Sequence, residues 1–199
     1  MLKPLYILVV VALLGRGHAD GQSYGGPNVL GPFRIDKDVS MSTLFERLGR
    51  PSKVANDVFC YKSKDDWAFL VVTRMAEVYD AKVAGDVLLS SFCNCIDRPA
   101  QVTPNDLLAW KTEKGIGLGA RVEGVRKAYG PPSKEDKIEG TGYRWVIHGD
   151  FRDNHYTTEK RPEIGDTVLV YQGTADDSRT AEFGIRQRKV VWIFLSKNE

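Results

Sequence analysis

The sequence predicts an α+β fold of two duplicated units, each with a short helical layer packed on one face of an antiparallel sheet. Three observations predict this fold. The turn "LGRPSK" at 48–53 recurs as "YGPPSK" at 129–134. An amphipathic stretch precedes each copy of the turn, and short runs rich in β-branched and aromatic residues follow each copy.

The amphipathic stretches predict one helix per unit. Apolar positions 41, 44 and 48 match positions 122, 125 and 129 at an offset of 130 − 49 = 81. This i, i+3, i+7 spacing indicates one buried helix face. Ser40 or Ser42 is the expected cap of the first helix. Gly49 and Gly130 stand where a left-handed residue ends a helix, and the next residues include a proline that does not continue it.

The runs after each turn predict strands. The first turn is followed by "DVFCYKS", "DWAFLVVTR" and "GDVLLSSF"; the second by "GYRWVIHG", "DTVLVYQG", "TAEFGIRQ" and "KVVWIFLS". Val87 matches Val190 at an offset of 190 − 87 = 103, so the second copy carries 103 − 81 = 22 extra residues. The repeats therefore span 33–94 and 115–199. A linker, 95–114, joins them, with one helical turn at "PNDLLAW" capped by Asn105 or Asp106.

Residues 1–19 have the order of a secretory signal peptide. Lys3 precedes the apolar run from Leu5 to Leu14, and small residues near Ala19 suit a signal peptidase. The run is shorter than the roughly 20 residues that span a bilayer, although a retained membrane anchor is the alternative. We therefore expect a secreted protein, periplasmic or extracellular. Residues 20–32 are rich in Gly and Pro without periodicity, which predicts a disordered lead-in.

The charge balance argues against a nucleic-acid partner. Cleavage after Ala19 removes Lys3 and Arg16, so 28 − 2 = 26 basic residues remain against 26 acidic ones. A neutral chain lacks the clustered basic charge of a nucleic-acid binder. We expect no cofactor, because "GIGLG" at 115–119 lacks both the Lys-Ser/Thr of a P-loop and the βαβ context of a dinucleotide fold.

Cys60, Cys93 and Cys95 are the cysteines of the chain. In an oxidising compartment two of three cysteines are expected to pair. A bridge between Cys93 and Cys95 closes a small, strained ring, so we expect Cys60 to pair with Cys93 or Cys95. A three-cysteine metal site is the alternative, but zinc sites more often use C-x2-C spacing.

The run "GIGLGARVEGVRKAYGPPSK" at 115–134 resembles a signature of small secreted bacterial domains. Their superfamily includes the small outer-membrane assembly lipoprotein and the β-lactamase inhibitory protein, itself a tandem repeat of two such units. The resemblance covers most of 33–199, but its specific part is short. The first copy has Asp36-Lys37-Asp38 where the second has Gly117-Leu118-Gly119. The resemblance implies helices on one sheet face, an open opposite face, and binding to proteins or the envelope rather than catalysis.

Alternation along the predicted strands assigns side chains to the two faces. In the last strand, Val191, Ile193 and Leu195 are assigned to the helix side, with Val190, Trp192 and Phe194 on the open side. In "TVLVYQG", Val168 and Val170 are assigned to the helix side, with Leu169 and Tyr171 outward. The first unit's outward set is Trp67, Phe69, Val87 and Leu89.

The outward aromatic residues form a candidate partner-binding patch. Its members are Tyr143, Trp145, Tyr171, Trp192 and Phe194, with Ile147 beside them. Large rings suit an open, partner-facing surface. The alternative is that they are buried core, or that the two sheets pack their open faces together.

The segment 148–166, "HGDFRDNHYTTEKRPEIGD", is a candidate recognition loop, with Phe151 and Tyr156 as contact rings. It also holds His148, Asp150, Asp153 and His155, which are weak candidates for a metal site or a hydrolase centre. Their spacing matches no known ligand pattern, and a solvated surface loop is the simpler interpretation. We therefore expect a secreted, non-enzymatic module that binds a protein or envelope ligand, with no catalytic residues; a metal-binding protein or hydrolase is the alternative.

Overall fold

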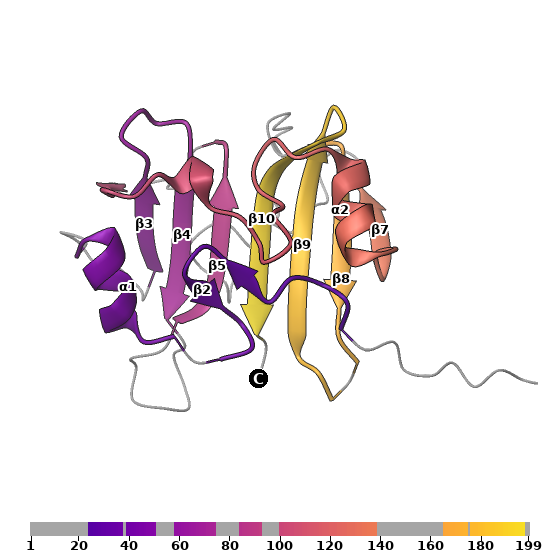
Figure 1. Ribbon diagram of the computed structural model, residues 1–199, viewed down its shortest axis with the longest axis horizontal. Coiled ribbons are helices and arrows are strands. Elements are labelled where there is room, and N and C mark those ends of the chain that lie inside the picture. Colours follow the sequence, from indigo (N-terminus) through magenta and orange to yellow (C-terminus); the bar gives the residue numbers. More distant parts are fainter. Residues whose placement is uncertain are drawn as a thin grey trace, which may run out of the picture.

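The computed structural model describes residues 24–37, 39–50, 58–74, 84–92, 100–138, 165–174 and 176–197. Over these residues the chain has a mixed α/β fold that is largely sheet: an eight-stranded sheet and two α-helices (Figure 1). No helix among them is long and apolar enough to cross a membrane. The predicted signal peptide, 1–19, lies outside the described residues.

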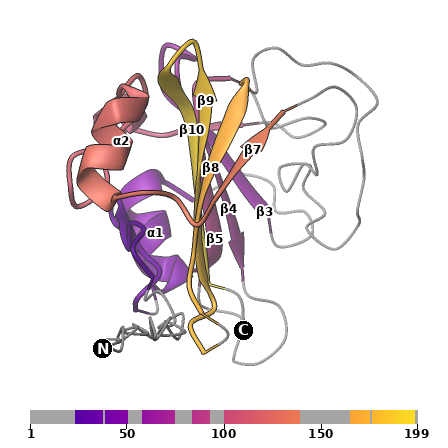
Figure 2. The ribbon, with the colours of Figure 1, turned by 90° about the vertical axis from the view of Figure 1, so that its right-hand side faces the viewer.

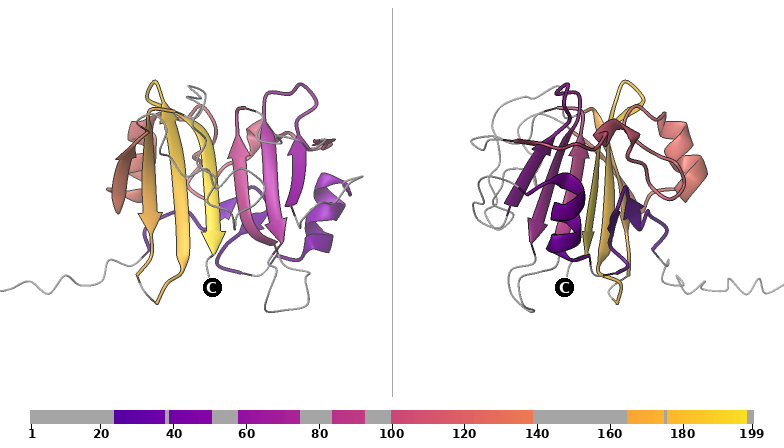
Figure 3. Two further views of the ribbon diagram at one scale, coloured as in Figure 1. Left: turned by 180° about the vertical axis from the view of Figure 1, so that it is seen from behind. Right: turned by 60° about the vertical axis from the view of Figure 1, so that its left-hand side comes forward.

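The eight-stranded sheet takes strands from both halves of the chain. The first half gives β3 (Val58–Lys62), β4 (Phe69–Arg74) and β5 (Ala84–Ser90); the connecting region gives β6 (Gln101–Val102). The second half gives β7 (Lys134–Lys137), β8 (Thr167–Gln172), β9 (Arg179–Arg186) and β10 (Lys189–Lys197). The order is β6-β3-β4-β5-β10-β9-β8-β7, as the view from behind shows (Figure 3). Only the β3–β6 pair among these neighbours is parallel.

Both predicted helices are present, with the predicted ends. Helix α1 (Met41–Leu48) buries Met41, Leu44 and Leu48, and the Ser40 hydroxyl accepts a hydrogen bond from the N–H of Thr43. Helix α2 (Val122–Tyr129) buries Val125 and Tyr129. Each helix ends at a glycine of positive φ, 85° at Gly49 and 78° at Gly130. The predicted turn in "PNDLLAW" is the 3-10 helix η1 (Leu107–Ala109), capped by Asp106.

The sheet carries an apolar layer on each face. Helices α1 and α2 lie on the same face (Figure 2). The layer beneath them, here the helix-side layer, includes Leu44, Tyr61, Val125, Phe183 and Ile193. The opposite layer consists of Val58, Cys60, Phe69, Val71, Leu88, Val168, Trp192 and Phe194, all buried. Because both faces are buried, several strands read as continuous apolar runs rather than alternating ones.

Residues 24–32 are ordered, so the predicted disordered lead-in is wrong over this stretch. The hairpin of β1 (Val29–Leu30) and β2 (Phe33–Arg34) buries Leu30 and Phe33 in the helix-side layer. Gly31 has φ +57°, and the ring of Trp110 lies directly against it. Glycine is therefore needed here for the close approach of the indole, not for chain flexibility.

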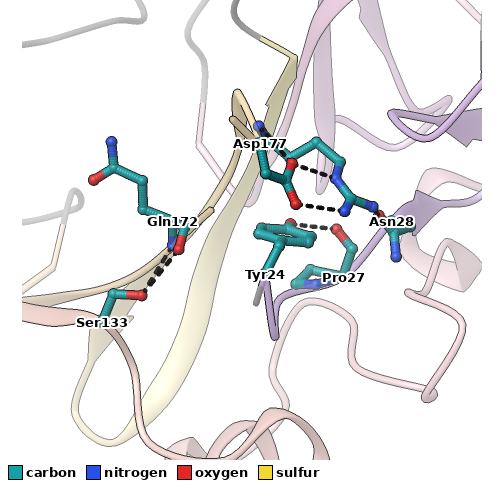
Figure 4. A network of polar contacts seen from close by, with 7 residues as sticks. Tyr24, Pro27, Asn28, Ser133, Gln172 and Asp177 are labelled. Atoms are coloured by element: carbon teal, nitrogen blue, oxygen red, sulfur yellow. Dashed lines mark hydrogen bonds and ion pairs between the residues drawn. The ribbon is translucent and has the colours of Figure 1, made fainter. Parts of the chain in front are cut away.

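A polar network fixes the start of this segment to the β8–β9 turn (Figure 4). The Tyr24 hydroxyl donates to the carbonyl of Pro27 at 2.6 Å. The Arg179 guanidinium lies 4.7 Å from the centre of the Tyr24 ring and donates to Asn28 and Asp177, both at 2.7 Å. The hydrogen bond from Arg179 lowers the pKa of Asp177. These contacts fasten residues near the start of the chain to its last third.

The two halves meet in a backbone ladder. Strands β5 and β10 pair antiparallel, with Leu88 opposite Phe194 and Leu89 opposite Ile193. The sheet is therefore continuous, and the predicted linker is partly core, because Leu107 and Trp110 are buried in the helix-side layer. The duplication of two units is not confirmed by this architecture alone.

The same kind of hydrogen bond, from a tyrosine hydroxyl to a glycine carbonyl, is present at the C-terminal end of both helices. The Tyr61 hydroxyl, from β3, donates to the carbonyl of Gly49 at 3.1 Å. The Tyr171 hydroxyl, from β8, donates to the carbonyl of Gly130 at 3.1 Å. Each tyrosine thereby satisfies a backbone acceptor that the helix end leaves without an intrahelical partner.

Candidate partner-binding surface

The predicted aromatic patch divides between different environments. Trp192 and Phe194 lie in the opposite layer, so the prediction that they face away from the helices is confirmed. They are only 1% and 6% exposed, which makes them core residues of that layer rather than an open surface. Tyr143, Trp145 and Ile147 lie outside the described residues.

Tyr171 was assigned to the wrong face. It lies in the helix-side layer, under α2, where its ring meets Tyr129 edge-on at 5.9 Å and Phe183 at 5.8 Å. Leu169 shares this face, while Val168 and Val170 pack in the opposite layer. The assignment failed because both faces of the sheet are apolar, so the apolar character of a side chain does not indicate which face it points to.

The outward set of the first unit is half correct. Phe69 packs in the opposite layer, as predicted. Val87 and Leu89 instead lie in the helix-side layer. A similar inversion affects Val190, which faces the helices, and Val191, which packs against the opposite layer. A β-bulge between Val190 and Trp192 shifts the alternation by one residue there.

Trp67 is the exposed member of the predicted set. Its side chain is 68% exposed, more than that of any other large apolar residue among those described. It lies in the β3–β4 turn, and the buried Ser63 holds that turn. The Ser63 hydroxyl accepts from the N–H groups of Trp67 and Ala68 at 3.1 and 3.0 Å, and donates to Asp65 at 2.7 Å. The last bond lowers the pKa of Asp65.

A second exposed apolar residue lies at the same end of β3. Val102 of β6 is 46% exposed and pairs with Lys62, the last residue of β3. Lys62 forms an ion pair with Asp66 at 2.8 Å, and Asp66 has a positive φ of 60°. We call Trp67, Val102 and Lys62 the β3 corner. Val102 could not be predicted as part of a site, because a two-residue strand in a proline-containing linker gives no periodic signal.

Strand directions place the β3 corner at the same end of the sheet as the end of β7 and the start of β8, between which segment 148–166 lies in the sequence. Strands β3 and β7 run in the same direction, since each neighbouring pair between them is antiparallel. The C-terminal ends of β3 and β7 therefore lie at the same end of the sheet, the upper one in Figure 1, with five strands between them. We call this end of the sheet the turn rim. Phe151, Tyr156, His148, Asp150, Asp153 and His155 lie outside the described residues. Their roles stay predictions.

The turn rim also holds a strained turn that the sequence did not reveal. Gln187 and Arg188 connect β9 to β10 with φ of 49° and 63°, a conformation normally taken by Asn-Gly. The Arg188 carbonyl accepts from the N–H of Val122 at 2.9 Å, and its guanidinium pairs with Glu123. The N-cap residue of α2, Arg121, makes no side-chain cap. The strained turn therefore replaces the missing cap.

Chemistry-bearing clusters are sparse in the part of the chain that the structure describes. No group of three or more His, Cys, Asp or Glu side chains gathers there as a metal site would require. Cys60 is buried in β3. Cys93 and Cys95 lie outside the described residues, so the pairing of Cys60 stays a prediction.

The comparisons with known proteins add no assignment. The chain matches no protein-family model, no curated protein and no solved structure. The resemblance of residues 115–134 to small secreted bacterial domains therefore stays an expectation.

Proposed function

We propose that this protein is a secreted, non-enzymatic module that binds a protein or a cell-envelope ligand at its turn rim. The observation that carries the proposal is Trp67: a tryptophan two-thirds exposed in the turn between β3 and β4. Exposing such a ring to water is unfavourable for an isolated chain, and tryptophan is enriched among the residues that dominate binding energy.

The order of the turn strengthens the proposal. Three hydrogen bonds through Ser63 fix the backbone on both sides of Trp67. A residue that is already ordered loses little conformational entropy when a partner covers it. Val102, paired with Lys62 at the end of β3, adds exposed apolar area at the same end of that strand. Segment 148–166, which lies in the sequence between β7 and β8, is the proposed second part of the surface.

Affinity capture from the envelope fraction and culture fluid of the native host tests the proposal. The bait is the full mature chain, compared with Trp67→Ala and with Leu108→Ala. Leu108 is a matched control, because it is 41% exposed on η1, whose neighbour Leu107 packs on the helix side. We expect Trp67→Ala to weaken partner binding by about 2 kcal/mol, and Leu108→Ala to leave it unchanged. Equal retention by all three baits would contradict the proposal.

We also propose that the two halves of the sheet are duplicated units related by an approximate twofold axis. Two ladders support this relation. Tyr61, Leu70, Leu89 and Ile193 are successive partners across the first half, and Tyr171, Ala181, Leu195 and Val87 across the second. Leu89 then corresponds to Leu195, an offset of 195 − 89 = 106. The offset of 103 predicted from the sequence differs from 106 by three residues, an odd number. Because side chains alternate between the two faces along a strand, the predicted offset assigns Val87 and Leu89 to the wrong face.

The bulges agree with this correspondence. The ladder shifts between Ala84 and Val87 on β5, and between Val190 and Trp192 on β10. At the offset of 106, positions 84–87 correspond to 190–193, so the two bulges overlap. If the units are equivalent, Tyr61→Phe and Tyr171→Phe remove the same contact to a helix-ending glycine. Each variant is expected to lose about 1 kcal/mol of unfolding free energy in urea titrations. A loss confined to one of the two tyrosines would contradict equivalent roles.

A further inference from the structure

A half-buried carboxylate lies at the bulge between β4 and β5. The Thr73 hydroxyl donates to Asp86 Oδ2 at 3.1 Å, and the N–H of Asp86 donates to the same hydroxyl oxygen at 2.9 Å. Across the ladder, Asp86 is opposite Ser196 of β10, whose hydroxyl also bonds the carboxylate. Alternation along β5 places Asp86 on the same face as Leu88, in the opposite layer.

This carboxylate has no cationic partner among the described residues. Burial raises the pKa of Asp86, and the hydrogen bonds from Ser196 and Thr73 only partly counter that effect; among the side chains that the structure describes, no charged group contributes. Withdrawing a carboxylate from water without a countercharge is costly to the folded protein. Two hydroxyl groups orient it, yet they do not neutralise it.

The equivalent place in the second half is filled differently. At the offset of 106, Asp86 corresponds to Trp192, and Thr73 corresponds to Gly184, its ladder partner. There the indole of Trp192 covers the glycine, so large and small side chains complement each other. In the first half these positions hold the carboxylate of Asp86 and the hydroxyl of Thr73, so a polar pair stands where the second half has apolar packing.

We infer that Asp86, oriented by Thr73 and Ser196, is a binding site for the guanidinium group of an arginine side chain presented by a peptide or protein. Guanidinium is preferred over ammonium because it is weakly hydrated and packs against apolar and aromatic groups. Leu88 and Phe194, paired across the ladder, supply such neighbours. The site lies towards the end of the sheet away from the turn rim, so it is separate from the β3 corner.

The test is an NMR titration of the full mature chain with N-acetyl-arginine amide, following the carboxyl carbon of Asp86. We expect saturable binding that lowers the pKa of Asp86, because a bound cation favours its charged form. Asp86→Asn keeps the shape and removes the charge, and it is expected to weaken binding about tenfold or more. Asp176→Asn removes an exposed carboxylate in the β8–β9 turn and is expected to leave binding unchanged.

Two results would overturn the inference. If the pKa of Asp86 in the wild-type chain is the same with and without the probe, Asp86 only stabilises the bulge; this measurement needs no variant. If N-acetyl-lysine amide binds as tightly as the arginine probe, the guanidinium assignment fails. Neither result depends on Trp67, so failure here is distinguishable from failure of the proposed turn-rim surface.

Discussion

Replacing Gly184 with alanine is expected to disrupt the opposite layer. A Cβ atom at position 184 lies 1.9 Å from Trp192 Nε1, 2.1 Å from Cε2 and 2.4 Å from Cδ1. Ordinary contact begins at 3.4 Å, so the indole must move by about 3.4 − 1.9 = 1.5 Å along that direction. Trp192 is only 1% exposed, so the movement must displace neighbouring core side chains.

The expected loss is at least about 2 kcal/mol of unfolding free energy, in the upper part of the range for overpacked cores. For a urea m-value of about 2 kcal/mol/M, the unfolding midpoint falls by about 1 M. Trp192→Ala alone is expected to cost about 3–5 kcal/mol, because it leaves a large cavity. In that background the extra methyl group meets no indole, so Gly184→Ala should cost less than about 0.5 kcal/mol.

Equilibrium urea unfolding, followed by far-ultraviolet circular dichroism, measures all four chains of this double-mutant cycle. Gly124→Ala is the matched control, because a Cβ atom there meets only Ile116 Cδ1 at 3.8 Å. Within α2 it should stabilise the protein by about 0.5–1 kcal/mol. A Gly184→Ala chain within about 0.5 kcal/mol of wild type would refute the close packing of Trp192 against β9.

Three further outcomes are expected. Gly31→Ala combines a positive φ with Trp110 Cδ2 at 2.4 Å, and should cost about 2 kcal/mol, or about 4–8 °C in melting temperature by calorimetry. Replacing Gln187-Arg188 with Asn-Gly relieves two left-handed residues and should stabilise the chain by about 1 kcal/mol; a lower melting temperature would mean that the Arg188–Glu123 contact outweighs the backbone strain. Burial raises the pKa of Asp86 above its unfolded value of 3.8, so its contribution to stability is complete below pH 3.8 and is lost as pH rises through the folded pKa. Asp86→Asn should therefore be more stable than wild type near neutral pH, with the difference shrinking in unfolding titrations at lower pH.

Local signals in the sequence were sufficient for the helices and their ends. Ser40 acts through a local side-chain hydrogen bond, and Gly49 and Gly130 act through their own backbone geometry, so their roles follow from the neighbouring residues. The strands after each turn were also placed correctly where the structure describes them. These elements depend on short-range physics that a sequence pattern carries directly.

The sheet faces could not be predicted in the same way. Leu169 and Tyr171 lie beneath α2 because the pairing of β8 with β9 sets the direction of every side chain along it. When both faces are apolar, a shift by one residue leaves the composition of each face nearly unchanged. The bulge near Val190 and the Asp86–Thr73 pair arise from contacts between strands, and no local pattern encodes them.

The ladder between β5 and β10 has a consequence for how this protein meets a partner. The β5–β10 pairing runs from Asp86–Ser196 to Ser90–Trp192. Because main-chain hydrogen bonds join the two halves along this seam, the halves are not expected to rotate relative to each other when a ligand binds. A ligand would find a fixed, preshaped face, and its selectivity would come from fit alone. Amide protons of this seam should be among the last to exchange with deuterium, since releasing them requires the whole molecule to come apart.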